Sequence, residues 1–219
     1  MKLALFDLDN TLLDGDSDHL WGEYLIARGV VDAAWYRREN DRFLSEYRDG
    51  RLDIDEFLRF ALQPLAEHPP DTLQHWRQDF IEQMIMPRIP TESLQLVDRH
   101  RNEGELPVIV TATNRFVTEP IAQLFGIDHL LATEAEMING EFTGQVAGTP
   151  CFREGKLIRL REWLGGGSGA LEAASFYSDS SNDLPLLEAV GQPVAVNPDS
   201  TLEAIARERG WPIMALRAA

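Results

Sequence analysis

Four short segments, far apart in the chain, carry the side chains that a phosphate-binding site needs. They are Phe6–Thr11, Val110–Thr113, Gly155-Lys156 and Ser178–Asp183. The first and the last each hold two carboxylates directly after an apolar run that is typical of a buried strand. Carboxylates gathered at strand ends repel one another unless a metal ion or another cation lies among them. The set therefore predicts a charged centre to which each segment contributes one part.

Asp7 and Asp9 could carry out a chemical step. They are two residues apart, so their side chains leave an extended backbone on the same side. One carboxylate can attack a phosphorus atom as a nucleophile, and the other can act as a general acid and then as a general base. Taken alone, the pair is explained equally well by aspartates that cap a solvated strand end.

Asp179 and Asp183 follow a second predicted strand. Asp183 could simply be an acidic residue in the first turn of a helix, where the helix dipole favours it. Asp179 comes directly at the strand end and is harder to explain in that way. Together with Asp7 it would form a hard, oxygen-rich site that suits Mg²⁺, which takes one or two carboxylates, several waters and a substrate phosphate.

Thr111 and Lys156 complete the set. Thr111 comes after an apolar run, where its hydroxyl and a backbone N–H could hold phosphate oxygens, although a β-branched residue is also ordinary in a strand. The chain has 18 arginines and only two lysines, so the lysine at position 156 is notable. A compact ammonium suits a phosphoryl oxygen beside a carboxylate, whereas a lysine at a helix start is usually solvated.

The composition limits the possible partners. The chain has 219 residues and a formal net charge of −16, so nucleic acid and anionic membranes are poor partners. Its single cysteine, Cys151, excludes an internal disulfide and a cysteine-rich zinc site. The sequence shows neither a signal peptide nor an apolar stretch of the roughly 20 residues that a membrane helix needs. We therefore expect a cytoplasmic protein, a monomer or a homodimer, that acts on a small molecule.

The order of the predicted elements indicates an α/β protein with a helical insert. Residues 16–86 lack a convincing strand and show helical spacing of apolar residues, which glycines and prolines divide into about four helices. Residues 1–15 and 87–219 alternate strands with helices, which predicts a Rossmann-like parallel sheet with helices on both faces. We therefore predict a catalytic core of residues 1–15 and 87–219 and an all-helical cap of residues 16–86. Ligands of such sheets bind at the carboxyl ends of the strands, where the four segments are expected.

The core elements can be placed individually. Strands are predicted at residues 2–8, 107–111, 129–132, 174–177, 193–196 and 213–215, and helices at 91–103, 116–125, 156–164, 182–190 and 199–209. Asn139-Gly140 predicts a hairpin turn between two short strands. The glycine-rich run 165–169 follows a helix and precedes a strand, the reverse of the order in a phosphate loop, so we interpret it as a connector.

The four segments together resemble the motifs of the haloacid dehalogenase superfamily of aspartate-nucleophile phosphatases. The chain has Asp-x-Asp-x-Thr at residues 7–11, the threonine after the second strand, the lysine and the final Asp-x-x-x-Asp in the order of that family. A helical cap inserted after the first motif also fits. Within the superfamily the chain looks like the phosphoserine-phosphatase-like branch, subfamily IB, which includes histidinol phosphatases. The closing segments Val194–Pro198 and Ala206–Pro212 are similar to that branch as well.

The resemblance implies a role for each motif residue. Asp7 would be the nucleophile and a magnesium ligand, and Asp9 would be the acid and base and would offer its backbone carbonyl to the metal. Asp179 would be the third protein ligand, and Asp183 would orient metal-bound water or the lysine. The phosphoryl group would be held by Thr111, Ala112, Lys156 and Asn182.

Asp16 bears on the substrate. It lies nine residues after Asp7, where phosphoserine phosphatases of this family carry a glutamate that faces the substrate amine. The resemblance therefore implies an amine-bearing substrate, with the cap acting as a lid that presents Asp16, His19 or Trp21. A helix N-cap at Asp16 or Ser17 explains the residue equally well.

Departures from the family pattern leave the substrate open. Thr111-Ala112-Thr113 stands in place of Ser-Gly-Gly, and Ser178 stands where a glycine commonly precedes the metal aspartate. For a substrate carboxylate, only Arg48 and Arg51 are nearby candidates. Phosphoserine and histidinol phosphate, which has an amine but no carboxylate, both remain possible.

Other classes of protein share parts of this pattern. A dehalogenase would need neither Asp9 nor a metal, and a response-regulator receiver would be shorter and would lack the insert. A phosphate-binding relative without activity would be expected to have lost an acidic residue, and none is lost. We therefore predict a Mg²⁺-dependent phosphomonoesterase of a small phosphorylated metabolite, working through an aspartyl-phosphate intermediate. A phosphotransferase or phosphomutase of the same superfamily, or a phosphate binder, is the alternative.

Overall fold

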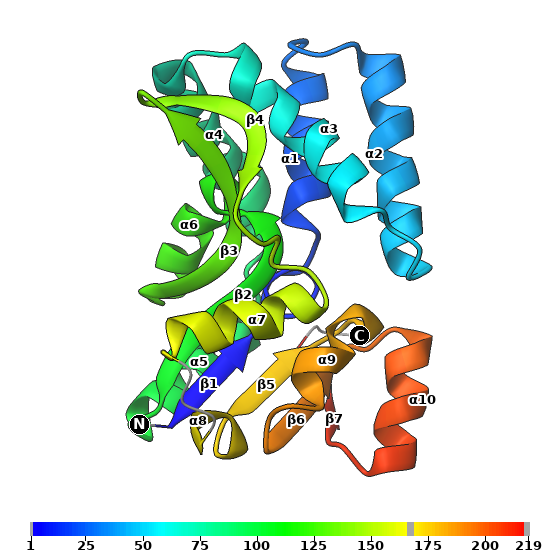
Figure 1. Ribbon diagram of the computed structural model, residues 1–219, viewed down its shortest axis with the longest axis vertical. Coiled ribbons are helices and arrows are strands. Elements are labelled where there is room, and N and C mark those ends of the chain that lie inside the picture. Colours follow the sequence, from blue (N-terminus) through cyan, green and yellow to red (C-terminus); the bar gives the residue numbers. More distant parts are fainter. Residues whose placement is uncertain (1, 166–168, 217–219) are drawn as a thin grey trace.

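A mostly parallel sheet forms the centre of the computed structural model, which describes residues 2–165 and 169–216. Within these residues seven strands follow the order β4-β3-β2-β1-β5-β6-β7 (Figure 1). Every neighbouring pair is parallel except β3 and β4, which are antiparallel. The strands are β1 (Leu3–Phe6), β2 (Leu106–Asn114), β3 (His129–Ile138), β4 (Glu141–Ala147), β5 (Ser175–Ser178), β6 (Gln192–Val196) and β7 (Ile213–Met214). The predicted α/β fold is confirmed.

Strand β1 lies in the middle of the sheet because its side chains are apolar on both faces. All four of its residues are fully buried. Leu3 and Leu5 pack into one hydrophobic core, and Ala4 and Phe6 pack into the other, as the alternation of side chains along a strand requires. The parallel partners of β1 are β2 and β5, with Phe6 opposite Tyr177 of β5. The carboxyl ends of these three strands therefore meet at one edge of the sheet.

Helices cover both faces of the sheet, as predicted. Buried residues of α5 and α6 share a core with Phe6, whereas buried residues of α7, α8, α9 and α10 share a core with Leu5. These helices are α5 (Thr91–Asn102), α6 (Arg115–Leu124), α7 (Glu154–Trp163), α8 (Gly169–Glu172), α9 (Leu184–Leu187) and α10 (Ser200–Arg209). No helix in the described part of the chain combines the length and the apolar character that crossing a bilayer requires.

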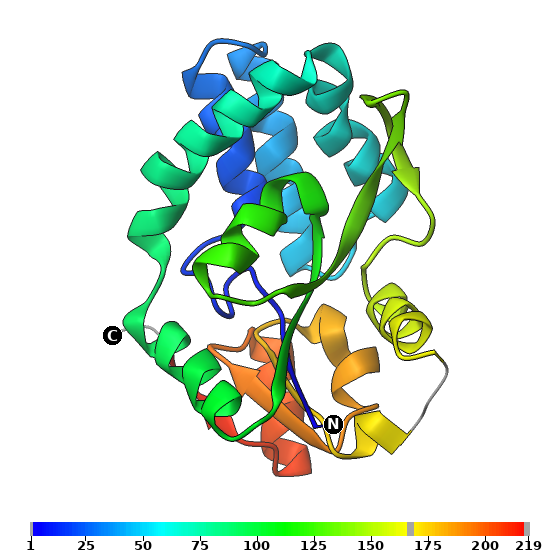
Figure 2. The same ribbon diagram turned by 90° about the vertical axis from the view of Figure 1, so that its left-hand side faces the viewer.

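Four further helices lie together at one end of the molecule (Figures 1 and 2). They are α1 (Ser17–Ala27), α2 (Ala33–Arg48), α3 (Ile54–Glu67) and α4 (Pro70–Phe80). The first three begin at aspartates, since the carboxylates of Asp16, Asp32 and Asp53 accept hydrogen bonds from backbone N–H groups of the first turn. A π-helical turn (Ile81–Ile85) and a 3₁₀ turn (Met86–Arg88) lead from α4 back toward the sheet. The division into cap and core at residues 16 and 86 stays a prediction.

The β3–β4 hairpin extends from the sheet toward these helices (Figures 1 and 2). Its turn is the predicted Asn139-Gly140, whose φ angles of 54° and 86° suit a type I′ turn. Gly144 of β4 lies against α3, because a Cβ at this position would stand 3.3 Å from the Cβ of Ala66. Strand residues therefore help to bury the helical end of the molecule, which the sequence pattern did not indicate.

Several predicted element bounds were wrong. Strand β2 runs on to Asn114, which pairs with Thr133 of β3, so Thr111 lies inside a strand and not at its end. The helix predicted over residues 182–190 is a 3₁₀ turn (Ser181–Asp183) followed by the short α9. The Ser180 hydroxyl accepts a hydrogen bond from the backbone N–H of Asn182 and tightens this turn. Of the glycine-rich run, residues 166–168 lie outside the described residues, and Gly169 begins α8.

We predict that Leu5→Ala destabilises the protein by about 2–5 kcal/mol, because the substitution leaves a cavity at a fully buried site in the central strand. Ile158→Ala is the control, since Ile158 is 44% exposed on α7 and its truncation should change stability by less than about 0.5 kcal/mol. Urea unfolding of both variants measures the difference. Equal effects of the two substitutions would contradict this placement of β1.

Candidate active site

The carboxyl ends of the central strands bring the predicted segments together. Asp7 follows β1, Asp179 follows β5, and Thr111 lies in the second half of β2. After Asp7 the chain turns tightly, with the backbone N–H groups of Leu12 and Leu13 both donating to the carbonyl of Leu8. This turn leads the chain from the sheet edge to the start of α1. The acidic motif and the first cap helix are therefore neighbours in space as well as in sequence.

Lys156 lies at the centre of the site. Its ammonium Nζ donates to Asp7 Oδ1 at 2.6 Å and to Asp183 Oδ2 at 2.7 Å. All three side chains are almost fully buried. Gly155 permits this placement, because a Cβ there would stand 2.0 Å from the carbonyl oxygen of Pro150. The close approach of the chain at Gly155 carries the first turn of α7, and with it the lysine, against the end of β1.

Two hydroxyl groups fix the carboxylates around this lysine. The Ser178 hydroxyl donates to Asp183 Oδ2 at 2.7 Å. Thr11 Oγ1 lies 3.2 Å from Asp7 Oδ2 and 3.1 Å from Asp179 Oδ1, and it accepts a hydrogen bond from the backbone N–H of Asp179. Thr11 therefore links the first motif to the last, and Ser178 has a structural use in the position where the family commonly has glycine.

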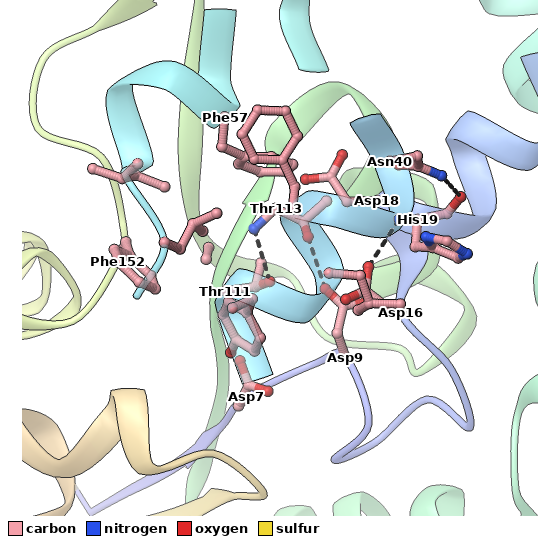
Figure 3. A pocket seen from close by; sticks show the side chains of 16 residues that line it. Asp7, Asp9, Asp16, Asp18, His19, Asn40, Phe57, Thr111, Thr113 and Phe152 are labelled. Carbon is pink, nitrogen blue, oxygen red and sulfur yellow. Dashed lines mark hydrogen bonds between the residues drawn. The ribbon is translucent and has the colours of Figure 1, made fainter. Parts of the chain in front are cut away.

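Asp9 belongs to both the sheet edge and the cap. Its Oδ1 accepts a hydrogen bond of 2.6 Å from the backbone N–H of Ser17, the first residue of α1. Its Oδ2 accepts a hydrogen bond of 2.8 Å from the hydroxyl of Thr113 on β2 (Figure 3). The start of a helix favours a carboxylate, and these two donors hold the carboxylate in one orientation.

Burial dominates the protonation of these groups. It raises the pKa of Asp7 from 3.8 to about 7, although the charge of Lys156 opposes the shift. Burial and the charge of Asp16 raise the pKa of Asp9 to about 6, against the hydrogen bonds from Ser17 and Thr113. The pKa of Asp179 is also raised by burial, and the charge of Asp7 adds to that effect. Burial disfavours the charged form of the lysine, yet its two carboxylate partners outweigh burial and raise the pKa of Lys156.

This donor set fits a magnesium ion. Asp183 Oδ1 is buried without a hydrogen-bond partner among the described atoms, and burial raises the pKa of Asp7 and of Asp179 even though the charge of Lys156 opposes both shifts. Among residues 2–165 and 169–216, one set of side chains holds its potential metal-binding atoms close together. This set is His100, Glu103 and Glu105, and it lies outside the pocket. Mg²⁺ takes only one or two protein carboxylates directly and fills its remaining positions with water and phosphate oxygens.

A pocket lies between the sheet edge and helices α1, α2 and α3 (Figure 3). Its polar part contains four aspartates, Asp7, Asp9, Asp16 and Asp18. Its other wall is aromatic and aliphatic, and consists of Phe43, Leu44, Tyr47, Leu52, Ile54, Phe57 and Phe152. No lysine or arginine is among the described residues that line this pocket. The pocket is therefore acidic at one side and apolar at the other.

The structure places the sequence-predicted residues in two groups. Asp7, Asp9, Asp16, Thr111 and Ala112 line the pocket. Behind them, the side chains of Lys156, Asp179 and Asp183 belong to the hydrogen-bonded network around Asp7.

Asn182 makes a different contact from the one predicted for it. Its side-chain amide donates to the backbone carbonyl of Tyr47 in α2 at 3.0 Å, and its Oδ1 accepts from Arg153 at 3.1 Å. Arg153 in turn donates to the carbonyl of Gly50. Asn182 therefore ties the last motif to the cap, and its predicted contact with phosphate stays a prediction.

Asp16 is the N-cap of α1 and also lines the pocket, and its contact with a substrate amine stays a prediction. Its Oδ1 caps α1 by accepting a hydrogen bond of 2.9 Å from the backbone N–H of His19, and the residue also lines the pocket. Of the two candidate arginines, Arg51 is exposed and pairs with Asp49. Arg48 is also exposed and does not line the pocket, although its charge opposes the increase that burial causes in the pKa of Asp16.

Sequence reasoning missed Asp18, Thr113, Arg153 and Tyr47. Asp18 was missed because acidic residues are common in the first turn of a helix. Thr113 could have been found from period-two spacing, since it leaves β2 on the same side as Thr111. Nothing in the local sequence marks Arg153 or Tyr47, whose contacts arise only when cap and sheet edge meet.

Comparison with known proteins identifies the family. The family model of haloacid dehalogenase-like hydrolases matches residues 4–188. The chain belongs to this superfamily. Similar relatives include a histidinol-phosphatase of Neisseria meningitidis serogroup C (strain 8013), which is 44% identical over 217 residues, 97% of this chain and 98% of the relative. A phosphoserine phosphatase of Mycobacterium tuberculosis (strain ATCC 25618 / H37Rv) is 32% identical over 99% of this chain and 71% of its own length.

Solved structures agree with this placement in the haloacid dehalogenase-like hydrolases. A protein of unknown function from Bordetella pertussis Tohama I has a TM-score of 0.93 and 44% sequence identity, with 99% of both chains covered. A substrate-bound phosphoserine phosphatase has a TM-score of 0.70 and 19% identity, with 99% of this chain and 93% of the other covered, and shows the shared fold. The predicted superfamily and the predicted phosphatase class are confirmed.

The raised carboxylate pKa values predict an unusual pH dependence of stability in metal-free protein. Folded Asp7, with a pKa of about 7, keeps a proton that the unfolded chain, with a pKa of 3.8, releases. The free energy of unfolding should therefore fall as the pH rises from about 4 to 7, by at most about 1.4 kcal/mol per pH unit for each such proton. Mg²⁺ should offset this loss, because a cation stabilises the ionised carboxylates.

Urea unfolding between pH 5 and 7.5, with chelator and with Mg²⁺, measures this effect. Asp7→Asn should reduce the slope in chelator, whereas the exposed control Asp128→Asn should leave it unchanged. A free energy of unfolding that rises with pH in the metal-free protein would show that these carboxylates are not destabilised by burial.

Proposed function

We propose that the protein is a magnesium-dependent phosphomonoesterase that works through an aspartyl-phosphate intermediate. The observation that carries this proposal is the contact of Lys156 with Asp7 at the end of β1. A buried ammonium holds one oxygen of a pocket-lining carboxylate, and a second carboxylate, Asp9, lies in the same pocket. When bound, Mg²⁺ would neutralise charge on the carboxylates and on the phosphate, with Asp7, Asp179, the carbonyl of Asp9 and Asp183 as the residues that hold it or its water.

The residues present support a two-step reaction. An oxygen of Asp7 attacks phosphorus, a new O–P bond forms, and the ester O–P bond breaks while Asp9 gives its proton to the leaving oxygen. Water then attacks the phosphoryl group on Asp7, Asp9 takes a proton from that water, and phosphate leaves. A pKa of about 6 suits Asp9 for both proton transfers near neutral pH. Lys156 and the backbone around Thr111 and Ala112 would stabilise the phosphoryl oxygens.

We propose an amine-bearing substrate and favour histidinol phosphate over phosphoserine. Asp16 reaches the pocket and can pair with an ammonium group. A substrate carboxylate would find four aspartates and no lysine or arginine among the described lining residues, which disfavours phosphoserine. The relative from Neisseria meningitidis, named histidinol-phosphatase, is consistent with this choice. The expected cytoplasmic location and the monomeric or homodimeric state stay predictions.

Phosphate release from a panel of small phosphomonoesters tests the reaction class. We expect release in the presence of Mg²⁺ and little in the presence of chelator. Asp7→Asn should lower kcat by more than about a thousandfold, because the amide cannot act as the nucleophile. Asp9→Asn should lower kcat by about a hundredfold or more through loss of the general acid. Release that persists in Asp7→Asn would disprove the aspartyl-phosphate route, and phosphate transferred to a second compound would indicate a phosphotransferase.

Asp16→Asn separates the two roles of Asp16. Asparagine caps a helix about as well as aspartate, so the stability should change by less than about 0.5 kcal/mol. The charge is lost, so KM for histidinol phosphate should rise about tenfold or more, whereas KM for phenyl phosphate should not change. The matched control is Asp32→Asn, which alters the N-cap of α2 outside the pocket. Equal kinetics of wild type and Asp16→Asn would leave Asp16 with the capping role alone.

A further inference from the structure

Asp18 is a pocket-lining carboxylate to which neither the reaction nor the family motifs give a role. It is the second residue of α1 and is half-buried. In Figure 3 Asp18 lies in the upper part of the group of labelled residues and Asp7 lies at its lower end. Asp18 therefore faces the part of the pocket that lies away from the phosphate end.

Among the described residues, no lysine or arginine lines the pocket around Asp18. Burial, followed by the charges of Asp16 and Asp9, opposes its ionised form, and only the Thr113 hydroxyl favours that form. That hydroxyl has a single proton, which is donated to Asp9 at 2.8 Å. A carboxylate that lines a pocket without a cation can be stabilised by an N–H group of a ligand.

A comparison of α1 with α3 shows that a position in the first turn of a helix does not by itself bring an aspartate into the pocket. Helix α3 begins with the same Asp-x-Asp pattern, since Asp53 is its N-cap and Asp55 is its second residue. Asp55 is exposed to solvent and lies outside the pocket, whereas Asp18 lines it. An exposed carboxylate such as that of Asp55 is enough to stabilise the start of a helix, so this stabilisation does not require Asp18 to line the pocket.

The aromatic residues of the pocket suit a flat ring. Phe43, Tyr47, Phe57 and Phe152 all line the pocket. The Nδ1 atom of His19, another lining residue, is buried and has no hydrogen-bond partner among the described atoms. An aromatic wall that faces carboxylates favours a ring whose N–H groups reach the acidic side, because the ring packs on the aromatic faces while its polar edge is paired.

We infer that Asp18 is a specificity residue that binds a second nitrogen group of the substrate, at the end of the molecule away from the phosphate. Asp16 would take the amine nearer to the ester, and Asp18 would accept a hydrogen bond from a nitrogen-bearing ring against the aromatic wall. The substrate class is thus a phosphomonoester with both an ammonium group and an N–H-bearing ring. This inference rests on the proposed function and deepens it, since histidinol phosphate has both groups.

The test compares three phosphomonoesters in wild type, Asp18→Asn and the matched control Asp55→Asn. Histidinol phosphate has the amine and the ring, phosphoethanolamine has only the amine, and phenyl phosphate has neither nitrogen group. We expect Asp18→Asn to lower kcat/KM for histidinol phosphate about tenfold or more, through KM, and to leave the values for the other two unchanged. Asp55→Asn should resemble wild type with all three. Asp18→Glu, which keeps the charge, should recover part of the loss.

Two outcomes of the kinetic test would overturn the inference while leaving the proposed function intact. An equal loss with all three substrates would show a structural role for Asp18, and no loss with any would show that it does not contact the substrate. Binding of the product histidinol, measured by calorimetry in wild type and Asp18→Asn, gives a second readout that needs no catalysis. Equal binding to both proteins would refute the contact. A wild type that binds histidinol but releases no phosphate would refute the proposed function alone.

Discussion

The buried contact of Lys156 with Asp7 and Asp183 is the interaction on which the rest of the site depends. One ammonium and two carboxylates out of water are costly unless they are paired, and removal of the ammonium would leave both carboxylates uncompensated in the interior. The surrounding structure satisfies this constraint in specific ways. Gly155 lets the chain approach closely enough to deliver the lysine, and the Ser178 hydroxyl adds a hydrogen bond to Asp183. The excess of carboxylate over ammonium that remains is what makes a divalent cation favourable there.

Contacts between the cap and the sheet edge involve the same acidic motifs. The first backbone N–H of α1 donates to Asp9, and the amide of Asn182 donates to a carbonyl in α2. Arg153 joins Asn182 to the carbonyl of Gly50. The groups that would hold phosphate are therefore connected directly to the helices that cover them.

The pocket has an uneven distribution of charge. Its cation, Lys156, lies behind Asp7 and is already paired, so the lining presents aspartates on one side and aromatic rings on the other. In a protein with a net charge of −16, an anionic substrate needs local attraction. The proposed metal would supply this attraction at the phosphate end, while the acidic lining would favour positive charge on the leaving group. Opposite charges at the two ends of one small molecule would thus be recognised by two different parts of the site.

The sequence by itself determined the fold class, the strands that carry the motifs and the identity of the acidic residues. These features depend on local spacing, such as the apolar run of β1 followed by Asp7 and Asp9, and local spacing is visible in one dimension. The sequence also gave the Asn139-Gly140 turn. Only the tertiary structure decided that Thr111 lies within a longer β2, that Asn182 turns to the cap and that Arg48 lies outside the pocket. The clearest case is the Asp-x-Asp start that α1 and α3 share, where Asp18 faces the pocket and Asp55 faces solvent. Identical local patterns receive different surroundings because packing between distant segments, and not helix propensity, fixes the direction in which each helix start points.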